Sequence, residues 1–129
     1  MMNKKILLVD DSTTALVMEQ MILKNFARFE FIVARDGQEA VDKALAELPD
    51  LIVMDVVMPR MNGFEACKLL RRREETRHIP IILVTTRGEP ENVEFGYASG
   101  CSDYVTKPIN GAELITKIED LIGAREETL

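Results

Sequence analysis

Five short apolar runs, each about as long as a strand, recur along the chain and limit the folds that it can adopt. The longest runs are continuous and lack polar alternation, which is typical of strands buried on both faces of a parallel sheet. Stretches with helical spacing of apolar residues separate the runs. This alternation predicts a doubly wound α/β fold, in which helices cover both faces of a five-stranded parallel sheet. The runs are 6–9, 31–34, 51–54, 79–84 and 104–106.

Three expected helices begin with the same local signal. Asp36, Asn62 and Asn110 are each followed by Gly, and a Glu stands three places further on. A short polar residue with Glu at this spacing can satisfy the free N–H groups at the start of a helix. The repeated signal therefore marks the helix starts of a strand and helix alternation.

Helical spacing also predicts which apolar side chains enter the core. We expect the first helix to bury Met18, Met21, Ile22 and Phe26, and the second to bury Val41, Ala44, Leu45 and Leu48. The triplet 71–73 of arginines is expected to be a solvated helix end. The short helix after Pro90 has a poor apolar stripe, which indicates weak anchoring, and the final helix is expected to bury Leu114, Ile118, Leu121 and Ile122 and to stop near Gly123.

Composition sets the class of protein. With 129 residues, 47% hydrophobic and 29% charged, we expect one globular domain over 1–124 and a polar tail over 125–129. A net charge of −6 disfavours direct contact with nucleic acid. Cys67 and Cys101 are too few and too far apart for a disulfide framework or a zinc site. The apolar run 6–9 is too short for a signal peptide or a membrane span, so we expect a cytoplasmic protein without membrane contact.

Asp55 ends an apolar run, which is a costly place for a charge unless it is paired or reactive. All strands of a parallel sheet present the same end, where ligands of such sheets bind. The following residues should therefore converge with Asp55 at one edge: Asp10, Asp11, Thr85 and Lys107. Three carboxylates there favour a hard cation such as Mg2+. An ammonium and a hydroxyl could hold a phosphoryl group that Asp55 attacks.

These residues resemble the receiver domains of two-component response regulators, including the single-domain chemotaxis type. The resemblance spans nearly the whole chain. It rests on Asp10-Asp11, on Asp55 with Pro59 and Asn62-Gly63, on Thr85 and on Lys107-Pro108. It implies a flavodoxin-like strand order of 2-1-3-4-5.

The resemblance also implies a function and assigns roles to residues. Asp55 would accept a phosphoryl group from a partner histidine kinase or phosphotransfer protein. Mg2+ would bind Asp10, Asp11, Asp55 and the backbone carbonyl of Val57; Lys107 and Thr85 would bind the phosphoryl oxygens, and Lys107-Pro108 is a candidate cis peptide.

Thr85 and Tyr104 would act as the switch, because a phosphoryl group draws Thr85 inward and vacates space for the Tyr104 ring. That movement would reshape the face made by the helix after Pro90, the strand 104–106 and the final helix. A downstream protein or a covalently linked effector domain would read this face, which could also form a homodimer. We thus expect a phosphoacceptor switch rather than an enzyme.

Several residues have a simpler interpretation when taken alone. A single Asp, Thr, Lys-Pro or Tyr after a strand is commonly a turn, cap or packing residue. His78 should lie in a surface loop at the opposite edge, where it cannot donate a phosphoryl group. Val57 has no polar side-chain atom to position water, so we expect slow self-dephosphorylation, and Arg87 is expected to contact the phosphoryl group or an acidic neighbour.

Other function classes remain as alternatives. An Mg-dependent phosphatase with an aspartyl nucleophile would use the same fold, but Val57 stands where a second acid would assist. A nucleotide- or flavin-binding module would need a Gly-rich or hydroxyl-rich cradle where the first turn has aspartates. The last alternative is an interaction domain that is not phosphorylated and keeps only a vestigial site, and the intact set of site residues argues against it.

Overall fold

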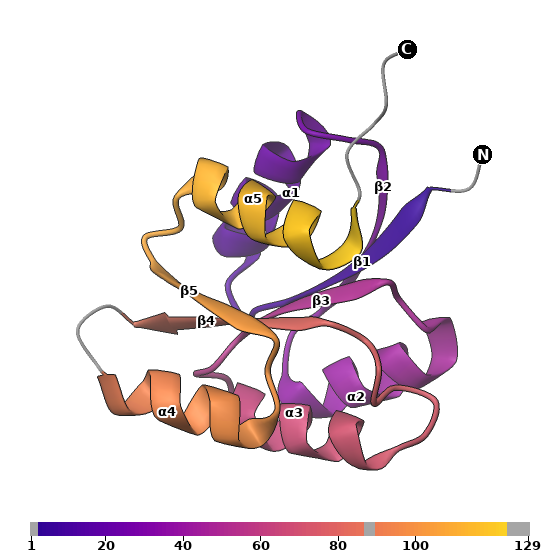
Figure 1. Cartoon of the computed structure of the whole chain (residues 1–129), viewed down its shortest axis with the longest axis vertical. Helices are drawn as coiled ribbons and strands as arrows, with labels where there is room; N and C mark the ends of the chain where they lie inside the picture. Colours follow the sequence, from indigo (N-terminus) through magenta and orange to yellow (C-terminus); the bar gives the residue numbers. More distant parts are fainter. Residues whose placement is uncertain (1–2, 87–89, 124–129) are drawn as a thin grey trace.

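A computed structural model describes residues 3–86 and 90–123 of the chain. Within them, five parallel strands form one sheet in the order β2-β1-β3-β4-β5 (Figure 1). The strands are β1 Lys4–Val9, β2 Phe29–Ala34, β3 Leu51–Asp55, β4 Ile81–Thr86 and β5 Asp103–Lys107. The helices are α1 Thr13–Lys24, α2 Gly37–Glu47, α3 Gly63–Arg72, α4 Pro90–Ser99 and α5 Gly111–Ile122. The predicted fold and strand order are confirmed.

The helices form two layers around the sheet. In Figure 1, α1 and α5 cover one face, while α2, α3 and α4 cover the other. Successive residues of a strand point to opposite faces, and β1 supplies both cores in this way. Ile6 and Leu8 pack with α1 and α5, whereas Leu7 and Val9 pack with α2 and α3, and all four side chains are buried. This double burial explains why the strands read as unbroken apolar runs.

The predicted helix caps are present. The side chains of Asp36, Asn62 and Asn110 accept hydrogen bonds from the backbone N–H three residues on, and Asn62 and Glu65 form a complete capping box. Gly123 ends α5 in the left-handed conformation, with φ of 58°. These local interactions begin and end the helices where the sequence predicts.

The predicted core stripe of α1 is only partly correct: Ile22 packs against the core as expected, but the two methionines do not. Met18 and Met21 are exposed at 58% and 61%, and the helix instead buries Leu16, Glu19 and Leu23. Val17 is also exposed, so apolar residues occupy more than one side of this helix. The spacing therefore fitted more than one stripe, and packing against the sheet selected the stripe that contains a glutamate.

A second core prediction fails at the end of α2. Val41 and Ala44 are buried and Leu45 packs against the core as expected, but Leu48 is 53% exposed. Leu48 ends the helix with φ of 48°, so it no longer follows the helical repeat. The side chain consequently leaves the buried stripe.

Arg71 does not lie at a solvated helix end. Its Nε donates to the carbonyl of Gly100 at 2.7 Å, and its Nη1 donates to the carbonyl of Ile79 at 2.7 Å and to that of Arg77 at 3.1 Å. It therefore ties the end of α3 to the loops that lead into β4 and β5. The exposure predicted for the triplet holds for Arg72 and Arg73.

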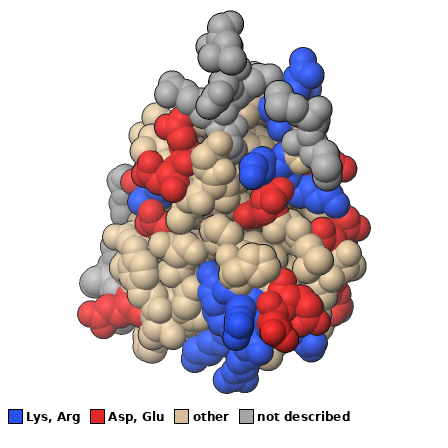
Figure 2. All heavy atoms as spheres, turned by 45° about the vertical axis from the view of Figure 1, so that its right-hand side comes forward, with Lys and Arg blue, Asp and Glu red and all other residues tan. Residues whose placement is uncertain are grey.

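Charged side chains are grouped on part of the surface of the molecule. Figure 2 shows basic side chains gathered at the lower end of one face, beside a group of acidic ones. No helix among the described residues is long and apolar enough to cross a membrane. His78 is exposed before β4, as expected. Arg87 and the predicted tail 125–129 lie outside the described residues.

Candidate functional site

Four predicted residues meet at the carboxyl edge of the sheet. Asp10 directly follows β1, and Asp55 is the last residue of β3. Thr85 is the second-to-last residue of β4, and Lys107 is the last residue of β5. The chain leaves β1 toward β2 and later returns to β3 on the other side, so the strand order reverses beside Asp10 and Asp55. Open α/β sheets bind ligands at such a reversal.

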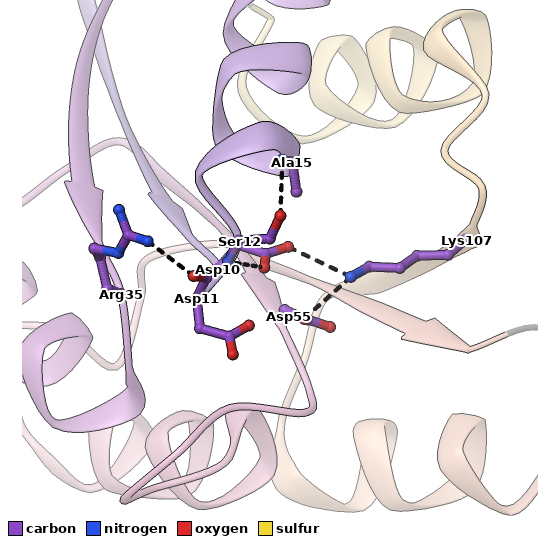
Figure 3. Close-up of polar contacts among 7 residues, drawn as sticks. All are labelled: Asp10, Asp11, Ser12, Ala15, Arg35, Asp55 and Lys107. Carbon is purple, nitrogen blue, oxygen red and sulfur yellow. Dashed lines mark hydrogen bonds and ion pairs between the residues drawn. The ribbon is translucent and has the colours of Figure 1, made fainter.

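Lys107 reaches across this edge to both buried carboxylates (Figure 3). Its Nζ lies 3.1 Å from Oδ2 of Asp55 and 3.4 Å from Oδ2 of Asp10. Asp10 is 1% exposed and Asp55 is 6% exposed, so both charges are largely removed from water. The ammonium is therefore the close cation that makes these two buried positions tolerable.

Burial still dominates the protonation of Asp55. It raises the pKa of Asp55, and repulsion by Asp10 adds to the rise, although hydrogen bonds from Lys107 and the Val57 backbone oppose it. Burial alone would lower the pKa of Lys107, but its hydrogen bonds and attraction to Asp55 and Asp10 raise it. One ammonium thus leaves an excess of negative charge at the site.

The carboxylates can supply ligands to a metal ion. One oxygen from each of Asp10, Asp11 and Asp55 lies within 4.8 Å of the others, and Asp11 is exposed to solvent. An all-oxygen set that is open to water suits Mg2+, which keeps several water ligands. The donor set and the excess negative charge therefore fit the cation predicted from the sequence.

Backbone contacts hold this acidic turn in place. The N–H of Ser12 donates to Oδ1 of Asp10 at 2.9 Å, and Nη2 of Arg35 donates to the Asp11 carbonyl at 2.9 Å (Figure 3). Arg35 was not predicted, because an isolated Arg after a strand carries no signal of a contact 24 residues away. Its guanidinium fixes the turn from the β2 side.

Thr85 has an unused hydroxyl. The residue is 2% exposed, and its Oγ1 has no hydrogen-bond partner in the described part of the chain. Its neighbour Val84 pairs with Asp55 in the sheet, so Thr85 lies one residue beyond the level of Asp55 on the adjacent strand. A buried hydroxyl without a partner usually has a ligand or a functional reason.

The other predicted residues are Val57, Pro108 and Tyr104, and Tyr104 lies three residues before the carboxyl end of β5. Val57 is 69% exposed, and the Lys107–Pro108 peptide is cis, as expected. Tyr104 is half-buried, and its ring packs edge-on against Tyr97, with centroids 5.8 Å apart. The Tyr104 ring therefore lies between its own strand and α4.

Glu19 is a buried charged residue that the sequence did not reveal. It occupies the buried side of α1 at 2% exposure, and burial raises its pKa to about 8, with a further rise from Asp10. Helical spacing placed methionines on that side, so no pattern singled out this glutamate.

The sequence of this chain is similar to those of named bacterial proteins. The alkaline phosphatase synthesis transcriptional regulatory protein PhoP of Bacillus subtilis is 38% identical over 97% of this chain, which spans 51% of PhoP. Protein PilH of Pseudomonas aeruginosa is 36% identical over 92% of this chain and 97% of its own length. The chain therefore corresponds to about half of the first relative and to nearly all of the second.

A solved structure agrees with these relatives. The receiver domain of sensor histidine kinase PA1611 from Pseudomonas aeruginosa, which has magnesium in its active site cleft, superimposes with a TM-score of 0.86 at 30% identity, covering 95% of this chain and 99% of that one. The model of the response regulator receiver domain family matches residues 6–119. The chain therefore belongs to the response regulator receiver domain family.

Proposed function

We propose that this chain is a phosphorylation switch of two-component signalling, with Asp55 as the phosphoacceptor. A carboxylate oxygen of Asp55 attacks the phosphorus of a phosphohistidine on a partner kinase or phosphotransfer protein. The new O–P bond forms as the N–P bond breaks, and the histidine nitrogen takes up the electron pair. The observation that carries the proposal is the buried Asp55, paired with Lys107 at 3.1 Å beside a hydroxyl without a partner.

The surrounding residues would hold the transferred group. Lys107 and Thr85 donate to phosphoryl oxygens, since one is a cation and the other a free hydroxyl. Asp10, Asp11, Asp55 and the Val57 carbonyl would hold Mg2+. When bound, this ion offsets the negative charge of the phosphoryl group.

Signal output is proposed for the face formed by α4, β5 and α5. Phosphorylation adds negative charge that draws Thr85 toward Asp55, and Tyr104 moves into the vacated space. Tyr97 of α4 packs against Tyr104 of β5 and is 49% exposed, so this face offers an aromatic contact to a partner or to a second copy of the chain. We place this switch in the cytoplasm, with either a separate partner protein or a linked effector domain as its output.

Intact-mass measurement tests the phosphoacceptor. The purified chain is treated with acetyl phosphate and Mg2+, and we expect the added mass of one phosphoryl group. Asp55→Asn should show no addition, and chelation of Mg2+ should prevent it in the wild type. Asp120→Asn, an equal charge change on the exposed side of α5, is the matched control and should be phosphorylated normally.

Two results would contradict the proposal. One is an equal mass increase in Asp55→Asn, which would place the phosphoryl group on another residue. The other is sustained release of phosphate from a phosphomonoester, which would indicate a phosphatase instead.

A further inference from the structure

A cavity of about 240 Å3 lies between α1 and the segment that follows β5. Its walls are mainly apolar, formed by Ala15, Met18, Ile22, Pro108 and Ile109. Two charged residues, Glu19 and Lys107, also line it. The cavity is therefore an apolar pocket with a small number of polar groups, which is the usual character of a small-molecule site.

Glu19 is the unsatisfied group of this cavity. The residue is 2% exposed, and its Oε1 has no hydrogen-bond partner among the described residues. An ionised carboxylate that is buried without a partner costs several kcal/mol. Burial accordingly raises the pKa of Glu19 to about 8. A ligand that supplied a positive charge would remove this cost.

Lys107 does not serve as that partner. Its ammonium is occupied by Asp55 at 3.1 Å and by Asp10 at 3.4 Å. Both aspartates act on Glu19 in the same direction and raise its pKa, whereas Lys107 lowers it. When no divalent ion is bound to the aspartates, negative charge is therefore in excess around the cavity, which favours a cation over an anion or a neutral ligand.

We propose that this cavity binds an alkylammonium group, with the ammonium paired to Glu19 and a short alkyl stem against the apolar walls. Each CH2 of the stem that leaves water for these walls adds to the affinity. The inference does not rest on phosphorylation of Asp55. Lys107 lines this cavity and also pairs with Asp55 in the candidate functional site. A ligand in the cavity would therefore contact the segment that carries the Lys107 ammonium.

Titration with n-butylammonium chloride tests the site. Amide NMR spectra of the whole chain are recorded in EDTA at about pH 8.5, where Glu19 is largely ionised and the amine remains protonated. We expect saturable shifts at Glu19, Ile22 and Ile109, with a dissociation constant on the order of millimolar for so small a ligand. n-Butanol has the same stem without the charge and should bind at least about tenfold more weakly.

Two variants separate the pairing from general charge effects. Glu19→Gln keeps the size of the side chain and should weaken n-butylammonium binding by about tenfold or more, equal to ~1.4 kcal/mol. Glu30→Gln makes the same charge change at an exposed position of β2 and should leave binding unchanged. Equal binding of n-butanol, unchanged binding in Glu19→Gln or no saturable shift would each overturn the proposal. The n-butanol comparison uses the wild type and so does not depend on how the variants fold.

The same chemistry can come from a free amine or from a lysine of a partner protein. A lysine with both backbone ends blocked as amides distinguishes them. Binding similar to that of n-butylammonium assigns the site to a lysine side chain. Binding of n-butylammonium alone assigns it to a small free amine.

Discussion

Glu19 is the residue at which burial and charge conflict most. Its ordinary pKa of 4.5 rises to about 8 in the folded chain, so the folded state binds a proton that the unfolded state has lost between these values. Stability from this residue is therefore fully present below about pH 4.5 and is lost as the pH rises through 8.

Glu19→Gln should consequently flatten the dependence of stability on pH. Between about pH 5 and pH 8, we expect the wild type to lose on the order of 2–4 kcal/mol of unfolding free energy relative to the variant, since a difference of one in pKa is worth about 1.4 kcal/mol. Urea unfolding in EDTA at several pH values measures this loss. Parallel curves for the two proteins would mean that Glu19 ionises in the folded state as it does in water.

Val57 sets the expected lifetime of the phosphoryl group. The side chain stands two residues after Asp55, is 69% exposed and has no polar atom that could position water. Wild-type phosphoprotein should therefore persist for minutes or longer, and Val57→Asn should hydrolyse several-fold faster. Loss of the phosphoryl mass over time gives the rate. A lifetime of seconds in the wild type would refute this expectation. Val17→Asn makes the same substitution at an exposed position of α1 and is the control, which should hydrolyse like the wild type.

At the scale of elements, α3 packs unusually closely against the end of β3. Gly63 is the first residue of α3, and a Cβ there would lie 2.5 Å from the backbone oxygen of Asp55. Gly111 has the same place in α5, after the same Asn cap, but a Cβ there would meet only the side chain of Ile22 at 3.3 Å. The two glycines differ in what they touch, although both follow an Asn cap and precede a Glu by two residues.

Alanine substitutions should separate them. Gly63→Ala has to move backbone beside Asp55, so we expect a loss of about 2 kcal/mol in unfolding free energy and slower phosphorylation. Gly111→Ala should change stability by less than about 1 kcal/mol, because Ala favours helix and the Ile22 side chain can shift. Urea unfolding and intact-mass kinetics measure both effects. Equal losses in the two variants would show that the approach of α3 to Asp55 is not tight.

At the scale of the whole molecule, folding gathers carboxylates from the carboxyl ends of β1 and β3, which lie far apart in the sequence. Asp10, Asp11 and Asp55 share a site only in the folded chain, and Lys107 supplies one ammonium. A divalent cation should thus bind the folded state in preference to the unfolded state.

Addition of Mg2+ should therefore raise the melting temperature. A free Mg2+ concentration of about 100 times the dissociation constant raises the unfolding free energy by ~2.7 kcal/mol. Asp10→Asn should lose most of this gain, whereas Asp120→Asn should keep it, and thermal unfolding with Mg2+ or EDTA compares them. A similar rise in Asp10→Asn would indicate a general salt effect and not a site.

The sequence patterns predicted the layers and the edge of the sheet at which the candidate site lies. Resemblance supplied the strand order, but the elements themselves follow from local patterns. Unbroken apolar runs mark buried strands, and the caps at Asp36, Asn62 and Asn110 mark helix starts. Parallel strands then bring Asp10, Asp55 and Lys107 to one edge however far apart they are in the chain.

Tertiary packing alone decided which side of α1 is buried and where three charged side chains lie. Apolar residues occupy several sides of α1, so contact with the sheet selected Glu19 for burial and left Met18 and Met21 exposed. Arg71 and Arg35 find their carbonyl partners in loops that are distant in the sequence. Local patterns record which neighbours along the chain can form an element, whereas these placements depend on segments that meet only after folding.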